Sequence, residues 1–442
     1  MSELSDTIFA RASGAGIAAV AVIRLSGPST RHVLQRLAGP LPPPRYASLR
    51  RLRCPDAGDT LDTALVLWFP GPASYTGEDS AELHIHGGAA VHADIALALV
   101  RLGCRPAEGG EFTRRAFLHG KLDLTQAEAT ADLIAAETSA QRRQALRQAD
   151  GALARLYGDW TARASRMLAH QEAAIEFAMD DLPTELDSAA RVMAAELADE
   201  IARHLADGRR GEKLRDGISV AIIGAPNAGK SSLLNALAGR EAAIVSAQAG
   251  TTRDVVECRL LLAGVPVTLA DTAGLRTTTD DIEREGVRRA SARADEADMI
   301  LAAFATDAEP DAATLALVGT HPAALLVATK CDLADPPATL GDRPLLRTSV
   351  RLDIGVDELK AELARQAAQR AGAVDGPVIT RARHRAALIE AYGLLMEARS
   401  AHQPELAAEA YRGTVRALGR VTGRVEVEDV LDIVFSDFCI GK

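Results

Sequence analysis

Residues 224–231 read Gly-Ala-Pro-Asn-Ala-Gly-Lys-Ser and fit the pattern G-x-x-x-x-G-K-[ST]. Glycines at these positions let backbone N–H groups turn toward a polyphosphate, the lysine reaches the β- and γ-phosphates, and the serine hydroxyl binds Mg²⁺. Residues 217–223 indicate a buried strand before the loop, and Ser232–Leu237 indicate the first turns of a helix after it. That order places phosphates at a helix N-terminus, which favours anions. The alternative is a chance glycine turn, which would have no reason to lie between a strand and a helix. We therefore expect a nucleoside triphosphate site.

A second motif concerns the base of the nucleotide. Residues 329–332 (Thr-Lys-Cys-Asp) follow the apolar stretch Ala324–Ala328, which indicates a strand. A carboxylate at Asp332 can accept hydrogen bonds from guanine N1–H and from its 2-amino group, whereas adenine offers no such pair of donors. Asp332 therefore favours GTP over ATP. Thr329 stands where Asn is usual, which we expect to weaken one supporting contact, and Ser349-Val350 is predicted to form a loop that cradles the base.

Two further segments lie where a metal and a switch are expected. Asp271-Thr-Ala-Gly274 follows the strand-like stretch Val265–Ala270. The aspartate can hold Mg²⁺ through water, and the Gly274 N–H can sense a γ-phosphate. Residues 250–254 (Gly-Thr-Thr-Arg-Asp) lie between the first two motifs, and Thr252 is predicted to complete the Mg²⁺ shell. The alternative for this last segment is an ordinary polar turn.

The catalytic glutamine of Ras-like enzymes is missing from its usual position. Leu275 follows Gly274 there, and a leucine cannot orient a water molecule, so another group must do so. Asn227 lies inside the phosphate loop, and its amide oxygen could help to bind a monovalent cation. Such a cation would neutralise charge that develops on the leaving oxygens, as an arginine finger does.

The whole chain has 442 residues, enough for about three domains. Its net charge of −10 means that a nucleic-acid partner would need a local basic patch or a second subunit. We find no apolar run of membrane-spanning length and no signal-peptide pattern, so no membrane contact is expected. The cysteines are widely spaced and odd in number, which favours neither a disulfide framework nor a zinc site and suggests a reducing cytoplasm. They are Cys54, Cys104, Cys258, Cys331 and Cys439.

The periodicity changes along the chain and predicts a multidomain protein of mixed α/β and all-α class. The N-terminal part alternates short strands and helices, predicted at Thr7–Ala12, Ala18–Leu25, Arg31–Leu37, Asp62–Phe69, Ala81–His86 and Ala89–Leu102. Long amphipathic helices are predicted over 125–180 and 185–210, and again after the α/β region. We therefore expect an α/β domain inserted into a discontinuous helical domain; two independent helical modules are the alternative. The predicted domains are 1–120, 121–215, 216–372 and 373–442.

These motifs together resemble the MnmE (TrmE) family of tRNA-modifying GTPases, and the similarity covers nearly the whole chain. The segments that carry it are 74–79 (Ser-Tyr-Thr-Gly-Glu-Asp), 86–88 (His-Gly-Gly), 110–126 (which matches GEFTxRAFLNGKxDL with His119 in place of Asn), 251–254, 271–276 and 437–442 (Asp-Phe-Cys-Ile-Gly-Lys). The resemblance implies an N-terminal α+β domain that binds folate and dimerises, a discontinuous helical domain and an inserted Ras-like P-loop GTPase domain.

The resemblance also implies an activity and its partners. A potassium-stimulated GTPase would act as a homodimer with the FAD protein MnmG in a heterotetramer. Together they would add a carboxymethylaminomethyl or aminomethyl group to C5 of the wobble uridine of certain tRNAs. The one-carbon unit would come from a tetrahydrofolate, in the 5-formyl or 5,10-methylene form.

The family's functional residues transfer to this sequence by position. Folate contacts are implied at Arg24, Glu82, Lys121 and Lys442, where a carboxylate suits the donor edge of a pterin and cations suit the glutamate tail. Potassium ligands are implied at Asn227, Ser246, Gln248 and Thr251, Mg²⁺ ligands at Ser231 and Thr252, and catalytic roles at Glu283, which orients water, and Cys439. The nucleotide site predicted in full comprises Asn227, Ala228, Gly229, Lys230, Ser231, Ser232, Ser246, Thr251, Thr252, Asp271, Gly274, Thr329, Lys330, Asp332 and Ser349.

Other interpretations of these residues stay open at this point. Cys439 could be a buried inert thiol rather than a reactive group near the one-carbon chemistry. The histidines His84, His86 and His92 suggest a metal only superficially, and packing or a pocket role is the better interpretation. The arginines Arg142, Arg143 and Arg147 could touch tRNA phosphates or form a solvated helix face. The alternative function is a ribosome-assembly GTPase without modification chemistry, although its usual basic RNA-binding module is not evident here.

Overall fold

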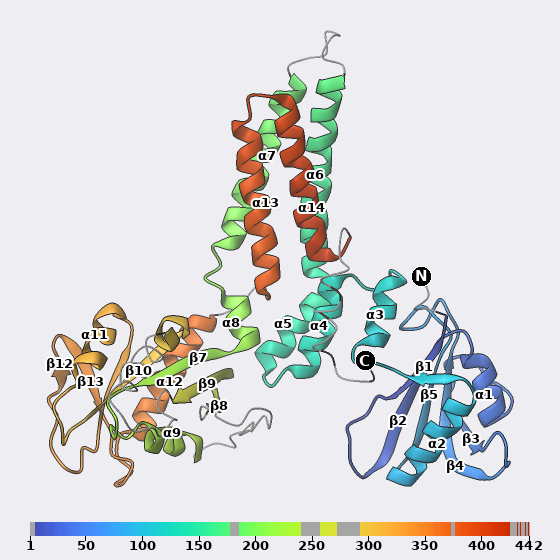
Figure 1. Cartoon of the computed structure of the whole chain (residues 1–442), viewed down its shortest axis with the longest axis horizontal. Coiled ribbons are helices and arrows are strands. Elements are labelled where there is room, and N and C mark those ends of the chain that lie inside the picture. The colour runs from blue at the N-terminus through green and yellow to red at the C-terminus, as the bar shows by residue number, and fades with distance from the viewer. Residues whose placement is uncertain are drawn as a thin grey trace, which may run out of the picture. The chain divides into compact units, whose positions relative to one another are not determined.

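A computed structural model describes residues 5–176, 185–239, 257–271, 292–372 and 376–424, together with Leu431, Val434, Phe438 and Gly441 (Figure 1). The chain divides into two compact units. The first comprises Met1–Ile134, Leu146–Asp199 and Ala387–Lys442, and the second comprises Ala135–Ala145 and Glu200–Ala386. Among the described residues, no helix combines the length and the apolar character that a membrane crossing requires.

The N-terminal part of the first unit is built on a mixed sheet with the strand order β3-β4-β5-β2-β1-β6. Neighbouring strands are antiparallel except β1 and β6, which are parallel. The elements are β1 (Thr7–Arg11), β2 (Ala18–Ser26), α1 (Thr30–Ala38), β3 (Ser48–Arg53), β4 (Thr60–Phe69), β5 (Ser80–Gly87), α2 (Ala89–Arg101), β6 (Cys104–Pro106) and α3 (Glu111–Leu118). The six elements predicted in this region are confirmed, whereas β3, β6 and α3 were not predicted.

The alternation of side chains along these strands separates a core face from a functional face. Ala81, Leu83 and Ile85 of β5 are buried in one cluster with α1 and α2. Because successive strand residues point to opposite faces, Glu82 and His84 lie on the other face of the sheet. Part of that face is covered by α3, whose buried aromatic ring at Phe112 clusters with β1 side chains. The remainder carries polar side chains such as Glu82 and His84 beside apolar ones such as their β4 partners Leu67 and Leu65.

A buried ion cluster fixes α3 to the sheet. The Arg115 side chain is 2% exposed, and its guanidinium lies 2.5 Å from an Asp6 carboxylate oxygen, 3.0 Å from Glu111 and 3.3 Å from Glu78. Arg105, which is much more exposed, also pairs with Asp6 and Glu111 at 2.7 Å. Burial alone would raise the pKa of Asp6 and of Glu111, but hydrogen bonds from the two arginines lower both pKa values.

Replacing this buried arginine is expected to destabilise the N-terminal part strongly. Arg115→Met should lower the free energy of unfolding by about 3–5 kcal/mol, because it leaves buried carboxylates without their counter-charge. The control is Arg105→Met at the exposed end of the same cluster, which should cost about 1 kcal/mol or less. Denaturant unfolding followed by circular dichroism measures both variants.

The pH dependence of the same cluster gives a second measurement. Carboxylates with lowered folded pKa values stabilise the protein above their unfolded pKa, and this contribution is lost as the pH falls through the folded value. In wild type, the contribution of these carboxylates to the free energy of unfolding should therefore decline below about pH 4.5. In Arg115→Met, protonation of the carboxylates removes the buried negative charge. The difference in free energy of unfolding between the variant and wild type should therefore become smaller from pH 7 toward pH 4. A difference that becomes larger over this range would contradict the ion-cluster explanation.

Helices form the middle and the end of the chain. They are α4 (Leu124–Ala135), α5 (Ser139–Ala149), α6 (Ala152–Glu176), α7 (Glu185–Leu205), α13 (Ala382–Ser400) and α14 (Pro404–Thr422). Figure 1 shows α6, α7, α13 and α14 side by side, and α6 packs along α14. Each contributes fully buried side chains, such as Tyr157, Leu197, Leu395 and Tyr411. Segments before and after the α/β region therefore share one helical bundle, as the predicted fold class requires.

The predicted long helix over 125–180 is interrupted, and local capping explains where. Thr138 Oγ1 accepts a hydrogen bond from the Gln141 N–H at 3.0 Å, and Gln141 Oε1 accepts one from the Thr138 N–H at 3.1 Å. This reciprocal capping box starts α5. Gly151, with a φ of +79°, lies between α5 and α6. The sequence 125–176 therefore forms three helices instead of one.

The second unit contains the predicted α/β sheet, with the strand order β12-β13-β11-β10-β7-β9-β8. Its central pairings are parallel, and the edge strands β8 and β12 are antiparallel to their neighbours. The elements are α8 (Arg210–Asp216), β7 (Ile218–Ile223), α9 (Lys230–Gly239), β8 (Glu257–Leu262), β9 (Val265–Asp271), β10 (Met299–Ala305), α11 (Ala312–Thr320), β11 (Leu325–Thr329), β12 (Thr339–Leu340), β13 (Arg343–Arg347) and α12 (Val356–Ala371).

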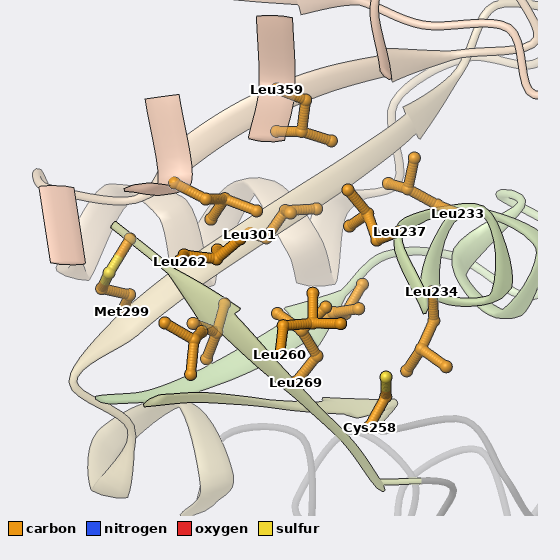
Figure 2. Close-up of a cluster of buried hydrophobic side chains, with 14 of the residues drawn as sticks. Leu233, Leu234, Leu237, Cys258, Leu260, Leu262, Leu269, Met299, Leu301 and Leu359 are labelled. Carbon is orange, nitrogen blue, oxygen red and sulfur yellow. The ribbon is translucent and has the colours of Figure 1, made fainter. Parts of the chain in front are cut away.

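The core of this unit lies between the sheet and the helices on either face. Figure 2 shows leucines of α9 and Leu359 of α12 packed on side chains of β8, β9 and β10. On the opposite face, Phe304 of β10 clusters with Val318 of α11. The parallel strands end together at one edge, where ligands bind in sheets of this kind. The exact domain boundaries given above stay predictions.

Candidate functional sites

The phosphate loop connects β7 to α9 in the predicted order. Gly224, the first loop residue, has a φ of +150°, and a Cβ there would lie 2.4 Å from the Ala303 carbonyl oxygen of β10. Only glycine fits this close approach. Asn227 is exposed at the bend of the loop in a left-handed conformation, with a φ of +64°. The amide side chain thus stands at the rim of the loop, where a small cation or a phosphate oxygen can reach it.

Lys230 and the serines after it begin α9. The Lys230 side chain is buried, and its ammonium donates hydrogen bonds to the Gly224 and Ala225 carbonyl oxygens at 2.7 and 2.8 Å. The lysine thus folds back across the loop, with its charge held at the helix N-terminus. Ser231 and Ser232 are exposed in the first turn. The Lys230 ammonium and the exposed residues Ser231 and Ser232 therefore lie at one helix start, the kind of place where proteins bind anions.

The loop predicted to bind the base follows β11. An Asp332 carboxylate oxygen accepts a hydrogen bond from Ser349 Oγ at 2.6 Å, and Arg351 lies 3.9 Å from the other oxygen. The Ser349 hydrogen bond lowers the pKa of Asp332, so the side chain stays ionised as an acceptor. Asp332 and Ser349 were predicted separately, and the structure brings them into direct contact.

A cavity of about 270 Å³ lies beside the phosphate loop and the end of β10. Its lining includes Pro226, Asn227, Phe304, Asp307 and Lys330. The Lys330 ammonium forms an ion pair with Asp307 at 2.9 Å. Asp307 was not predicted, because nothing in its local sequence marks the position where the strand ends.

Several predicted residues lie outside the described part of the chain. They are Ser246, Gln248, Thr251, Thr252, Gly274, Glu283, Cys439 and Lys442. For Asp271 only the backbone is described: it is the last residue of β9 and pairs in register with Ile222 of β7. The strand that carries Asp271 therefore ends beside the strand that leads into the phosphate loop.

A second polar site lies on the face of the N-terminal sheet that α3 partly covers. Arg24 of β2 and Glu82 of β5 are cross-strand partners, and their side chains meet at 2.9 Å. His84 lies 3.3 Å from the other Glu82 oxygen. Partial burial would raise the pKa of Glu82, but the hydrogen bond and charge of Arg24 lower it. Glu82 is thus an ionised, half-buried carboxylate on a sheet face.

Aromatic rings and a loop complete this second site. The Arg24 guanidinium lies 5.6 Å from the Tyr75 ring centre and 5.9 Å from that of Phe112. The Lys121 ammonium donates to the Pro72 carbonyl in the same loop as Tyr75. Arg24, Glu82 and Lys121 were predicted, whereas Tyr75 and Phe112 were missed as individual residues although both lie in segments of family resemblance.

Two of the three histidines predicted to serve packing or a pocket, His84 and His86, have separate carboxylate partners. His86 Nδ1 lies 2.7 Å from Asp62, whereas His84 contacts Glu82. Within the described ranges, His, Cys, Asp and Glu side chains form no group of three or more that could hold a metal ion. Arg142 and Arg143 are exposed on α5.

Two protein-family models match the segments of the chain that contain the two sites. The model of the GTP-binding protein TrmE N-terminus matches residues 7–121, and the model of the MnmE helical domain matches residues 124–439. The tRNA modification GTPase MnmE of Gluconacetobacter diazotrophicus is 57% identical over 98% of this chain and 98% of its own length. The chain belongs to the MnmE family. The MnmE of Granulibacter bethesdensis is 56% identical over 99% of each chain, and that of Paramagnetospirillum magneticum is 55% identical over 99% of this chain and 100% of its own.

Membership of the MnmE family makes this chain a P-loop GTPase, with GTP and Mg²⁺ as ligands. The match to the MnmE helical domain extends to residue 439, and described residues near this end contact the N-terminal part. A Cβ at Gly441 would lie 2.3 Å from the Arg11 carbonyl of β1, and one at Gly109 would lie 2.7 Å from the Phe438 carbonyl. The Phe438 ring is buried with Leu124 of α4. The described tail residues are therefore anchored against the N-terminal sheet and α4.

Proposed function

We propose that this chain is a GTPase switch that controls folate-dependent modification of the wobble uridine of certain tRNAs at C5. The product would carry a carboxymethylaminomethyl or aminomethyl group. The observation that carries the proposal is the presence, in one MnmE-family chain, of a guanine-type nucleotide site and a separate Arg24–Glu82 site. The two chemistries would be divided between the two sites, with GTP hydrolysis at the first and carbon transfer at the second.

In the GTP site, the loop N–H groups and Lys230 would hold the phosphates, and Asp332 would read guanine. Ser231 and Thr252 would bind Mg²⁺, with Asp271 acting through water. The exposed Ser231 hydroxyl at the start of α9 fits this role. Glu283 would orient the attacking water in place of the missing glutamine.

Asn227 would hold a potassium ion together with Ser246, Gln248 and Thr251. The proposal is supported by the exposed position of Asn227 at the left-handed bend of the phosphate loop, where its amide oxygen would lie next to bound phosphates. When bound, the ion would supply positive charge beside the leaving oxygens.

GTP turnover is therefore expected to depend on the monovalent cation. Phosphate release should be at least about tenfold faster in KCl than in NaCl at equal ionic strength. Asn227→Ala should remove most of this difference, since it deletes one oxygen ligand. Equal wild-type rates in the two salts would contradict the cation role of Asn227.

The Arg24–Glu82 site would bind a tetrahydrofolate. Glu82 offers a partly buried carboxylate for the donor edge of a pterin, Tyr75 offers a ring next to Arg24, and Lys121 offers a cation for the glutamate tail. Cys439 and Lys442 are proposed as further members. The anchoring of their described neighbours Phe438 and Gly441 on the N-terminal part supports this assignment. The bound folate would supply a one-carbon unit.

Glu82→Gln should weaken binding of 5-formyltetrahydrofolate about tenfold or more while leaving GTP hydrolysis unchanged, because the amide cannot replace an ionised acceptor. The matched control is Asp62→Asn, which neutralises another partly buried carboxylate on a neighbouring strand with a histidine partner. Isothermal titration calorimetry measures both. If the two variants lose affinity equally, Glu82 has no specific role.

The partners follow from the same proposal. The chain would form a homodimer through its N-terminal domain and a heterotetramer with the FAD protein MnmG, and tRNA would be the substrate. Its place of action would be the cytoplasm. Size-exclusion chromatography with light scattering, with and without MnmG, tests the assembly.

A further inference from the structure

Charge is distributed unevenly along the chain, and its start is basic. Residues 7–55 contain eight arginines and no lysine, aspartate or glutamate, whereas the whole chain has a net charge of −10. β3 lies at the edge of the N-terminal sheet, next to β4. Five of the eight arginines lie on β3 or on the segments before it, and together they are called the basic edge. They are Arg36, Arg45, Arg50, Arg51 and Arg53.

The positive charge of the basic edge is not neutralised by carboxylates. Arg36, Arg45 and Arg53 donate hydrogen bonds to backbone carbonyls, which carry no net charge. Among the described residues, no aspartate or glutamate forms an ion pair with any member of the basic edge. Asp56, in the loop after β3, pairs with Arg101 at 3.3 Å instead. Four of the five arginines are exposed, so their charge is available to a partner.

A negatively charged partner fits this edge better than a second copy of the chain. At a two-fold interface the same arginines would face one another and repel, and charged side chains on an edge strand discourage pairing with another sheet. The basic edge contains arginine and no lysine. The guanidinium binds phosphate through two parallel N–H groups, so phosphate is the anion that this composition favours.

An exposed aromatic ring among the arginines favours RNA as the source of the phosphates. Tyr46 follows Arg45 directly, and it is 71% exposed. Aromatic rings stack on unpaired bases, which RNA loops present and lipid headgroups lack. A ring and several guanidiniums on one strand edge are the combination that binds single-stranded segments of RNA.

The basic edge ends beside the proposed folate site. The Arg45 guanidinium lies 5.9 Å from the Phe69 ring centre and donates to the Ala73 carbonyl, in the loop that also contains Tyr75. Lys121 donates to the Pro72 carbonyl of the same loop. An RNA strand bound along β3 would therefore pass next to the site proposed to hold the one-carbon unit.

We propose that the basic edge binds the sugar–phosphate backbone of tRNA, with Tyr46 stacked on an unpaired base. This surface rests on the proposed function and supplies the local basic patch that an acidic chain needs for a nucleic-acid partner. Phosphate contacts position an RNA without reading its sequence, so the basic edge would hold different tRNAs with similar affinity.

Paired substitutions in the full chain test this surface. Arg51→Gln with Arg53→Gln removes two charges from the basic edge. The matched control is Arg365→Gln with Arg412→Gln, which removes two charges from arginines that pair with glutamates elsewhere. Fluorescence anisotropy of labelled tRNA measures Kd at several KCl concentrations. GTP hydrolysis and binding of 5-formyltetrahydrofolate check the other two sites.

We expect the edge variant to bind tRNA about tenfold more weakly. Its plot of log Kd against log salt should be shallower by about 2, because each lost phosphate contact releases about one counterion fewer. Tyr46→Ala should weaken binding at least about fivefold without changing this slope. The control should stay within about twofold of wild type, and every variant should keep GTP hydrolysis and folate binding.

The surface is wrong if the edge variant binds tRNA as tightly as wild type, or if the control loses as much affinity. It is also wrong if the edge variant keeps tRNA binding but loses binding to phosphatidylserine vesicles, or loses dimerisation measured by light scattering. Either result would assign the basic edge to a membrane or to a second copy. If wild type binds no tRNA at all, the proposed function fails together with this surface.

Discussion

Asp332→Asn is expected to change the preferred base of this GTPase from guanine to xanthine. An ionised carboxylate accepts from guanine N1–H and from the 2-amino group, and the hydrogen bond from Ser349 keeps it ionised and oriented. The asparagine amide presents a donor where guanine also presents one, so GTP affinity should fall about 100-fold or more. Xanthosine triphosphate carries a 2-oxo group that accepts from this amide, so its affinity should rise.

Competition of GTP and xanthosine triphosphate against labelled GDP measures this change. The control is Asp335→Asn, which neutralises an exposed carboxylate of the same loop that pairs with Arg347. That variant should keep the wild-type preference. A GTP affinity that survives Asp332→Asn would mean that guanine is recognised elsewhere.

Lys230→Ala is expected to reduce GTP hydrolysis by about 10²–10³-fold. The ammonium is held at the N-terminus of α9 by the Gly224 and Ala225 carbonyls, where it would meet the β- and γ-phosphates. Removing it deletes the one buried positive charge at the described phosphate loop, and a preorganised charge contributes this much to a transition state. The two carbonyls stay accessible to water, so the fold should survive.

Single-turnover phosphate release measures the rate, and a circular dichroism melt checks the fold. Lys213→Ala is the matched control in the same unit, because this partly exposed lysine pairs with Asp298 and lies outside the nucleotide site. Its rate should be that of wild type. A folded Lys230→Ala protein with normal turnover would remove the phosphate loop from catalysis.

The order of elements around the phosphate loop was predictable because its motif is local. A phosphate loop needs a strand, a glycine bend and a helix start within one short segment, and the structure has β7, Gly224 and α9 in that order. Asp332 could be assigned from its motif alone. Asp307 could not, because its role arises only where β10 ends beside β11.

The N-terminal site shows the limit of local patterns more clearly. Arg24 and Glu82 alternate correctly on their strands, but their contact depends on the register between β2 and β5, which spacing does not fix. Arg115 lies within a segment of family resemblance, and nothing in its local sequence marks it as buried. Its burial follows from Asp6, which lies 109 residues away in sequence. Only the resemblance pointed to Glu82 and Lys121.

The helical region was predicted to be helical, but the positions at which one helix ends and the next begins were not predicted. Alanine-rich amphipathic sequence predicted long helices over 125–180 without their breaks. The Thr138–Gln141 capping box was present in the sequence as a start signal. Capping residues outweigh helix propensity at such points, since they satisfy backbone groups that a new helix leaves unpaired. The bundle depends on packing between segments that are far apart in sequence, because α6 and α7 precede the inserted α/β region and α13 and α14 follow it.

The central claim is that GTP turnover by this chain controls modification of tRNA at C5 of the wobble uridine. Its most direct test is mass spectrometry of wobble uridines in tRNA from cells that lack the chain, complemented either with wild type or with Lys230→Ala. We predict uridine without the C5 group in the uncomplemented cells, restoration by wild type and no restoration by Lys230→Ala. Normal C5 modification in cells that lack the chain would contradict the claim.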